Sequence, residues 1–199
     1  MKIWDKIAKI YAKKRFFGKG LFKEEKFLLP KFLENCKFIL DAGCGTGRHL
    51  NFLKKFGKVV GIDYSKQMIK YALKKSKNLI LADLRALPFK TKVFDCVVCL
   101  GNTLGSLEND YEKVVQELNR VARKKVIIEV RVAEKDLIYR RKFENFSYRV
   151  KVWTIKTFEN FLKKMGLNEF ELIEGHKFKD SRFVYAIFKP KILRSKFKI

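Results

Sequence analysis

The stretch Phe38-Ile39-Leu40-Asp41-Ala42-Gly43-Cys44-Gly45-Thr46-Gly47-Arg48 runs from an apolar segment into a turn with glycine at alternate positions. The apolar run predicts a buried strand, and the glycines predict a tight turn whose backbone can approach a bound molecule. A second apolar run ends in Gly61-Ile62-Asp63, where Asp63 lies 16 positions after Gly47. A carboxylate at this distance accepts hydrogen bonds from both hydroxyls of a ribose, so the two segments predict a ribose-binding βαβ unit.

The spacing of the glycines separates this turn from two other glycine-rich loops. The dinucleotide fingerprint requires glycine at its first, third and sixth positions, and the sixth position here is Arg48. A phosphate-binding P-loop requires Gly-Lys-Ser/Thr, which does not follow. Both arguments oppose a ligand held through its phosphates.

The segment instead resembles motif I of the class I S-adenosylmethionine-dependent methyltransferases, of the methyltransferase domain 11/25 type. Three further segments resemble later motifs of that family in the same order: residues 59–68, 78–89 and 94–102. The first resembles the second strand, the ribose-binding acid and the following helix. The second resembles the third strand and the adenine-recognition loop, and the third resembles the fourth strand and its exit loop.

The resemblance implies that S-adenosylmethionine is the cofactor and S-adenosylhomocysteine the product. By resemblance, Met68 packs on adenine, the Asp83 carboxylate accepts from the adenine amine, and the Leu84 amide donates to the ring. The implied cofactor-binding residues are Asp41, Gly43, Cys44, Gly45, Gly47, Asp63, Tyr64, Met68, Asp83, Leu84, Leu100 and Gly101. Asn102 and Thr103, in the loop that passes the methionine end of the ligand in this family, are the candidate orienting residues. Asn102 is equally explained as a turn residue that tolerates the left-handed conformation.

The chain of 199 residues predicts a single α/β domain, and the resemblance implies that it is Rossmann-like and doubly wound. We expect strands near 37–42, 58–63, 78–82, 93–100, 125–132, 168–176 and 182–189, and helices near 47–56, 66–75, 109–122 and 157–165. The resemblance implies a seven-stranded, mostly parallel sheet, with the last two strands forming an antiparallel hairpin at one edge. Residues 1–36 are expected to form an N-terminal helical cap, and residues 190–199 a basic tail.

Residues 133–153 interrupt the alternation of strands and helices. Their period-two pattern after Phe146 predicts an inserted strand pair. Because loops at the carboxyl ends of strands surround the ligand in open α/β sheets, this insert is the expected substrate lid. The alternative is an edge that only extends the sheet.

The cysteines and histidines predict no metal site. Cys96 and Cys99 are three apart on an apolar strand, so their side chains point to opposite faces and cannot share a metal ion. We expect all four cysteines, Cys36 and Cys44 included, to be buried and reduced. His49 and His176 are expected at a helix start and a strand end, without a catalytic role.

The formal net charge is +25, with 46 Lys and Arg against 21 Asp and Glu. Such an excess attracts polyanions, and RNA is the obvious candidate. The charge is spread along the chain, however, as in the lysine-rich surfaces typical of thermophiles. The sequence contains neither a membrane span nor the apolar core of a signal peptide, so we expect a cytoplasmic protein.

The function expected from these observations is methyl transfer from S-adenosylmethionine, without a metal, to a small-molecule substrate. RNA, bound through the basic surface, is the alternative acceptor, and a non-catalytic nucleoside- or RNA-binding module is a further alternative. The loop after the fourth strand lacks the Asn/Asp-Pro-Pro-Tyr/Phe signature of the adenine and glutamine N-methyltransferases, which argues against those acceptors.

Overall fold

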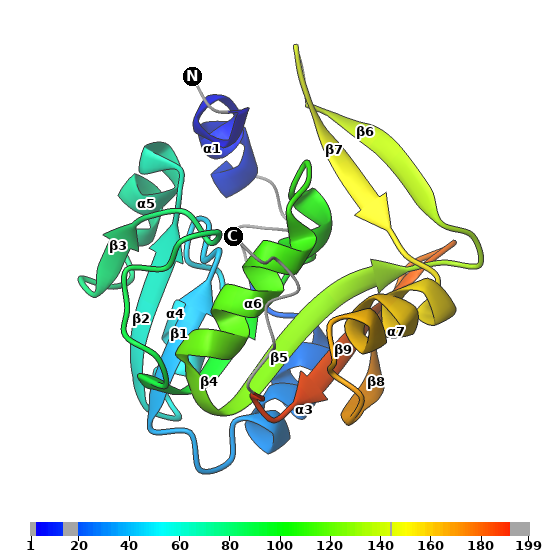
Figure 1. Ribbon diagram of the computed structural model, residues 1–199. Helices are drawn as coiled ribbons and strands as arrows, with labels where there is room; N and C mark the ends of the chain where they lie inside the picture. The colour runs from blue at the N-terminus through cyan, green and yellow to red at the C-terminus, as the bar shows by residue number, and fades with distance from the viewer. Residues whose placement is uncertain (1–2, 14–19, 144, 192–199) are drawn as a thin grey trace, which may run out of the picture.

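One seven-stranded sheet forms the centre of the molecule (Figure 1). The structure, a computed structural model, describes residues 3–13, 20–143 and 145–191. The strand order is β3-β2-β1-β4-β5-β9-β8. The strands are β1 (Phe38–Ala42), β2 (Lys58–Asp63), β3 (Leu79–Leu81), β4 (Phe94–Cys99), β5 (Ala122–Val132), β8 (Phe170–Lys177) and β9 (Arg182–Phe188). The predicted fold class, a Rossmann-like seven-stranded sheet, is confirmed.

The strand directions follow from the connections. β3, β2, β1, β4 and β5 are joined in parallel pairs, and each connection between them includes a crossover. β8 and β9 follow each other directly and pair antiparallel, as predicted for a hairpin at the edge. β9 also pairs antiparallel with β5, so the strand of opposite direction lies second from the edge, and β8 is outermost.

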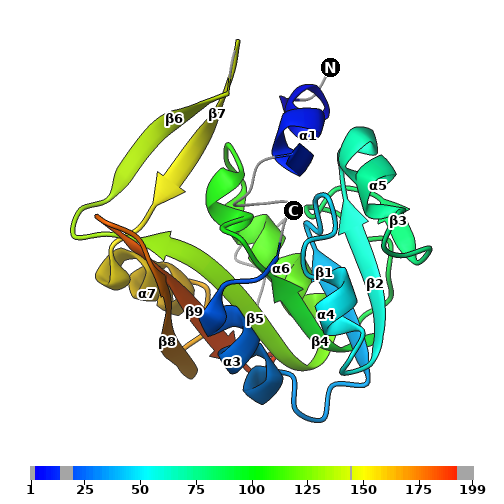
Figure 2. The same cartoon turned by 180° about the vertical axis from the view of Figure 1, so that it is seen from behind.

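Helices cover both faces of the sheet, as Figures 1 and 2 show from opposite sides. α6 (Tyr111–Val121) and α7 (Ile155–Lys164) lie on one face, where Leu118 and Phe158 share a buried cluster with Val97 of β4. α3 (Lys23–Phe32), α4 (Leu50–Leu53) and α5 (Lys66–Ala72) lie on the other face, where Leu29 and Leu53 pack with Val98. Adjacent residues of β4 therefore enter opposite cores, as expected of a strand buried on both faces.

The first crossover helix is shorter than predicted. We expected a helix over 47–56, but α4 covers only Leu50–Leu53. Gly47 has a φ of +77°, which a right-handed helix excludes, so the glycine turn continues to this position. After Leu53 the chain continues as turns with i to i+3 hydrogen bonds, such as Lys55 N–H to the Phe52 carbonyl at 3.1 Å.

The cysteine expectation is wrong for one pair. Cys36 and Cys96 form a disulfide with a Cα–Cα distance of 5.6 Å, while Cys44 and Cys99 are free and buried. The physical reason is the strand order, because β1 lies beside β4 with Ile39 paired to Cys96, which brings the segment preceding β1 close to Cys96. The predicted opposite orientation of Cys96 and Cys99 holds, since they belong to different core clusters.

The insert after β5 is a strand pair, as predicted. β6 (Leu137–Phe143) and β7 (Phe146–Val152) form their own two-stranded sheet, so they do not extend the central one. The insert is joined to β5 by a bridge between Val132 and Trp153. α1 (Ile3–Lys13) contacts both α5 and β7, and lies between them in Figure 1. The predicted basic tail lies outside the described residues from position 192 onward.

Candidate functional site

A cavity opens where the parallel strands end, at their carboxyl edge. Nine of the predicted site residues line it: Gly43, Gly45, Asp63, Tyr64, Met68, Asp83, Leu84, Gly101 and Thr103. Five do not line it: Asp41, Cys44, Gly47, Leu100 and Asn102. The four predicted motifs therefore meet at one place, although they are separated by up to 60 positions of sequence.

The glycine turn between β1 and α4 has two kinds of glycine. Gly43, Gly45 and Gly47 all have positive φ angles, of +76°, +52° and +77°. A Cβ at Gly47 would lie 2.8 Å from Cδ1 of Leu50, whereas a Cβ at Gly45 would meet no atom within 4 Å. Gly47 is thus required by packing inside the protein, and Gly45 leaves space on the side of the cavity.

Asp63, the last residue of β2, is held against this turn. Its Oδ2 accepts from the Gly45 N–H at 2.9 Å, and its Oδ1 accepts from the Ser65 N–H at 2.9 Å. Burial raises the pKa of Asp63 to about 6, although these N–H donors act in the opposite direction. The carboxylate is therefore fixed in orientation, and it is the group on this wall best placed to accept from a diol.

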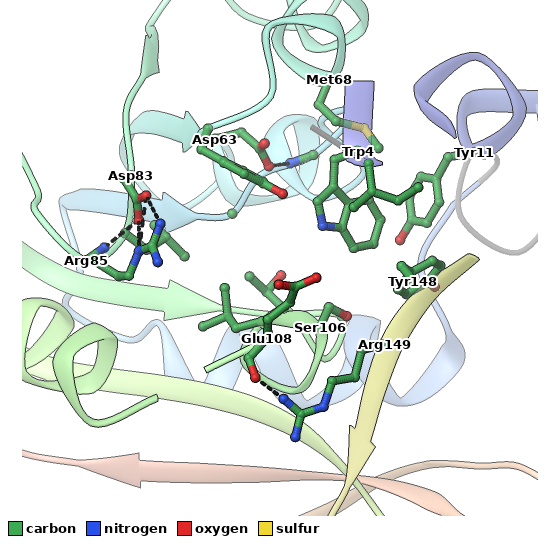
Figure 3. Close-up of a pocket in the computed structure, with 18 of the residues that line it drawn as sticks. Trp4, Tyr11, Asp63, Met68, Asp83, Arg85, Ser106, Glu108, Tyr148 and Arg149 are labelled. Carbon is green, nitrogen blue, oxygen red and sulfur yellow. Dashed lines mark hydrogen bonds and ion pairs between the residues drawn. The ribbon is translucent and has the colours of Figure 1, made fainter. Parts of the chain in front are cut away.

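Asp83 is engaged in an ion pair that the sequence did not indicate. Nη2 of Arg85 lies 2.6 Å from Oδ2 of Asp83, and Nη1 of the same arginine lies 3.1 Å from Asp110. Both Asp83 and Arg85 line the cavity, on the side opposite Trp4 in Figure 3. The predicted adenine contact of Asp83 would share this carboxylate with Arg85.

Asn102 lies behind the cavity and connects two other elements. Its Oδ1 accepts from the Arg131 N–H of β5 at 2.9 Å, and its Nδ2 donates to the Lys151 carbonyl of β7 at 3.4 Å. The residue is buried and has a φ of +58°. The left-handed turn conformation considered for Asn102 is thus present, and its side chain ties the insert to the sheet. Its neighbour Thr103 lines the cavity and donates to the Leu100 carbonyl at 2.7 Å.

A buried charge network supports the turn and the exit loop from beneath. Arg48 pairs with Glu25 of α3 through both carboxylate oxygens, at 2.7 and 2.5 Å, and His49 contacts the same carboxylate at 3.0 Å. Although burial opposes ionisation, the hydrogen bonds from His49 and Arg48 hold the pKa of Glu25 at about 2. Burial lowers the pKa of His49 to about 4. His49 is thus neutral near pH 7 and does not line the cavity.

Glu129 of β5 interacts electrostatically with Glu25 and Arg48 of this network. Its Oε2 accepts from the Gly101 N–H, which fixes the start of the exit loop. Burial, followed by the negative charge of Glu25, raises the pKa of Glu129 to about 7. No sequence signal singled out this residue, because an acid within an apolar strand acquires its partner only through the fold.

The roof of the cavity comes from two distant segments. Trp4 and Tyr11 belong to α1, and Tyr148 belongs to β7, and these three aromatic side chains gather on one side of the cavity (Figure 3). Met68 and Tyr148 are buried in a separate apolar cluster that also contains Ile7 of α1. Aromatic residues near position 4 and near position 148 gave no sequence signal of contact, because only tertiary packing brings them together.

The chain's own groups fit a nucleoside ligand with a charged amino-acid end. The cavity lies beside Gly45, where an added Cβ would meet no protein atom, and Asp63 also lines the cavity. Asp41, behind the turn, is buried and its Oδ2 has no hydrogen-bond partner within the part of the chain that the structure describes. Burial raises the pKa of Asp41 to about 7. When bound, S-adenosylmethionine supplies a methyl group that its positive sulfur already activates.

Residues 3–13, 20–143 and 145–191 contain neither a metal-binding cluster nor a membrane-spanning helix. Within these ranges no group of three or more His, Cys, Asp or Glu side chains could hold a metal ion. No described helix is both long enough and apolar enough to cross a bilayer.

The comparisons with known proteins identify a methyltransferase domain. A family profile described as "Methyltransferase domain" matches residues 39–125. The uncharacterized protein MJ0638 of Methanocaldococcus jannaschii is 35% identical over 189 residues, which cover 91% of this chain and 76% of the relative. A malonyl-[acyl-carrier protein] O-methyltransferase of Hamiltonella defensa is 36% identical over 52% of this chain and 42% of its own length. A tRNA (carboxymethyluridine(34)-5-O)-methyltransferase of Arabidopsis thaliana is 31% identical over 68% of this chain and 33% of its own length.

Solved structures share the fold. The PH0226 protein of Pyrococcus horikoshii superposes with a TM-score of 0.72 at 23% identity, covering 96% of this chain and 100% of that one. An S-adenosylmethionine-dependent methyltransferase of Clostridium acetobutylicum superposes with a TM-score of 0.66 at 17% identity, covering 94% and 99% of the two chains. With the sheet order, the glycine turn and the acid at the end of β2 in place, the chain belongs to the class I S-adenosylmethionine-dependent methyltransferases.

Proposed function

We propose that this methyltransferase acts on a small molecule, which binds in the cavity beneath α1 and β7. The charge of the cavity carries the proposal. Its ionisable acids are Asp63, Asp83 and Glu108, and its arginines are Arg85 and Arg149. No lysine of the described residues lines it, although the whole chain has a net charge of +25. A groove that tracks a phosphate backbone requires the opposite balance of charge at the site.

The proposed chemistry needs alignment more than acid or base strength. The acceptor atom, the methyl carbon and the sulfur must lie in line, and proximity with exclusion of water supplies much of the acceleration. We propose that Gly43, Gly45, Asp63 and Gly101 hold the donor, and that Thr103 orients its methionine end. Asn102 does not line the cavity and contributes indirectly, because its side chain fixes the position of β7 relative to the exit loop.

We propose that the insert is a lid, together with α1 of the N-terminal cap. Tyr148 and Arg149 of β7 line the cavity, as do Ile3, Trp4 and Tyr11 of α1. Both elements would have to separate, or the space between them would have to widen, for donor and acceptor to enter. We also propose that the chain forms a single domain, of which this lid is a part, and that the protein is cytoplasmic.

RNA is the second candidate acceptor, and two observations favour it. One relative is named as a tRNA methyltransferase, though this chain spans a third of that protein's length. The insert also carries consecutive basic residues, Arg140, Arg141 and Lys142, on β6. In this alternative the insert would hold the RNA backbone while one nucleotide enters the cavity.

Radiolabelled S-adenosylmethionine distinguishes the two acceptors. The protein is supplied with either unfractionated RNA or a small-metabolite extract, and the label is followed after separation by size. We expect label in the metabolite fraction and little change when Arg140 and Arg141 are both replaced by Glu. Label in RNA that is lost in the Arg140→Glu, Arg141→Glu variant would reject the small-molecule proposal.

A further inference from the structure

One side of the cavity is left over once the donor is assigned to the glycine turn, Asp63 and the adenine loop. This acceptor side is formed by α1, the loop before α6 and β7. The six residues that decide its chemistry are Trp4, Tyr11, Ser106, Glu108, Tyr148 and Arg149. Figure 3 shows them converging from three elements on the same space.

Three aromatic rings give this side a concave apolar wall. The ring of Trp4 lies 4.6 Å from the ring of Tyr148 at an interplanar angle of 50°, and 5.8 Å from the ring of Tyr11 at 86°. The Trp4 ring thus packs against both tyrosine rings, and all three side chains line the cavity. The faces of aromatic rings carry negative potential, and rings arranged around a space bind organic cations.

On this side of the cavity the Glu108 carboxylate can accept a cation, whereas the Arg149 guanidinium already donates a hydrogen bond. In Figure 3 the Glu108 carboxylate is directed into the cavity, on the side facing Trp4. Among the described residues no ion pair involves this carboxylate, and the residue is exposed. The Arg149 guanidinium donates instead to the backbone carbonyl of Glu108. Arg85, across the cavity, pairs with Asp83 and Asp110.

We propose that the acceptor is a primary or secondary amine, whose cationic form is recognised by the Trp4, Tyr11 and Tyr148 wall and by Glu108. The inference rests on the proposed small-molecule function. A carboxylate acceptor would be repelled by the available acid, and a hydroxyl, which carries no charge, would gain nothing from the attraction of the ring faces for cations. A carboxylate would also have to take an arginine from its present partner.

The reaction transfers a positive charge from the sulfonium of the donor to the nitrogen of the acceptor, next to the aromatic wall. The ammonium form of the acceptor loses one proton to the Glu108 carboxylate, and the freed nitrogen lone pair forms the new N–C bond. The C–S bond of the sulfonium breaks at the same time, and its electron pair stays on sulfur. The products are an N-methylated ammonium ion and neutral-sulfur S-adenosylhomocysteine, and Glu108 releases its proton to water. The aromatic wall faces a cation both when the acceptor binds and when the product forms.

Binding of choline to the protein saturated with S-adenosylhomocysteine tests the cation site without turnover. The matched neutral ligand is 3,3-dimethyl-1-butanol, which replaces the nitrogen of choline by carbon, and acetate is the anionic probe. We expect choline to bind about 5- to 30-fold more tightly than its neutral analogue, the range that cation–π contacts support. Trp4→Ala should remove this preference, and Trp4→Phe should keep part of it.

Two glutamate variants separate Glu108 from general surface charge. Glu108→Gln should reduce choline binding without changing affinity for S-adenosylhomocysteine. The exposed Glu112, in the first turn of α6 and outside the cavity, provides Glu112→Gln as the matched control with no effect. Equal affinity for choline and 3,3-dimethyl-1-butanol would overturn the inference. Tighter binding of acetate, lost in Arg149→Gln, would also overturn it and indicate a carboxylate acceptor.

Methyl transfer to defined pools separates this inference from the proposed function. Pools of amines, of carboxylates and of RNA are each supplied with radiolabelled S-adenosylmethionine. Label on amines, reduced in Glu108→Gln, supports the inference. Label on carboxylates rejects the amine and leaves the small-molecule proposal standing, whereas label on RNA rejects both.

Discussion

Replacement of Asp63 tests the cofactor site directly. In Asp63→Asn the side chain keeps one acceptor oxygen and gains an NH₂ group, which cannot accept a hydrogen bond. In the structure the two carboxylate oxygens already accept from the N–H groups of Gly45 and Ser65, at 2.9 Å each. The amide can satisfy only one of these, and it has no negative charge with which to bind a ribose diol. Hydrogen bonds to charged groups contribute about 1.5–3 kcal/mol, so we expect affinity for S-adenosylhomocysteine to fall about 10- to 150-fold.

The pH dependence of binding gives a second measure of the same group. The pKa of Asp63 is raised from 3.8 to about 6, so the carboxylate is protonated in an increasing fraction of molecules as the pH falls below 6. Because only the ionised form accepts from both hydroxyls, wild-type affinity at pH 5 should be about tenfold below its value at pH 8. The sign for stability is opposite: an acid with a raised folded pKa destabilises the fold as pH rises from 3.8 through 6. Weaker binding at pH 5 therefore does not follow from unfolding caused by this group.

Calorimetric titration with S-adenosylhomocysteine between pH 5 and pH 8 checks both expectations. Circular dichroism and thermal unfolding of each variant show whether the fold survives. In Asp63→Asn the contribution of this carboxylate to the pH dependence should disappear. Wild-type affinity in Asp63→Asn, or an unchanged pH profile, would refute the assignment of Asp63 to the ribose.

Three further predictions concern the turn, the disulfide and the exit loop. Gly45→Ala should abolish S-adenosylhomocysteine binding. Both Gly45→Ala and Gly47→Ala carry the strain of a positive φ, but Gly47→Ala should lower the melting temperature further, because only its Cβ also meets protein atoms; equal melting temperatures would contradict this. Reduction of the Cys36–Cys96 disulfide, which joins residues 60 positions apart, should lower the free energy of unfolding by about 4 kcal/mol, and thiol titration of the unreduced, denatured protein should find two free thiols rather than four. Asn102→Gly keeps the left-handed turn but removes the link to β7, so we expect methyl transfer to fall while cofactor affinity stays within about threefold, as measured by single-turnover kinetics.

The sequence predicted the central sheet and the side of the cavity formed by the glycine turn and Asp63 because both depend on local signals. Apolar runs of strand length located β1 and β2, and Gly43, Gly45 and Gly47 needed positive φ angles that glycine adopts most readily. The acid at the end of β2 followed from its spacing after the turn. The limits of α4 were missed, since propensity alone does not show where the positive φ of Gly47 ends the turn.

The roof, the disulfide and the network beneath the turn could not be predicted in the same way. Trp4 and Tyr148 are 144 positions apart, and their contact depends on how α1 and the insert fold back over the strand ends. The pairing of Cys36 with Cys96 depends on β1 lying beside β4, which is a property of the strand order. The Cys36–Cys96 pair could have been predicted only from the strand order β3-β2-β1-β4, which places β1 beside β4.

The charge of the cavity wall differs in sign from the net charge of the chain. Surface charges separated by more than about 8 Å are largely screened at physiological ionic strength. The charges that a bound molecule meets are those of the cavity wall, where Asp63 and Glu108 are acidic and Arg85 is already paired with Asp83. S-adenosylmethionine itself carries a positive sulfur, so an acidic wall favours its binding inside a basic protein. An amine acceptor would use the same wall, because methyl transfer returns a positive charge to it. An anionic acceptor would be repelled at the wall, and the distant lysines, being screened, would not offset that repulsion.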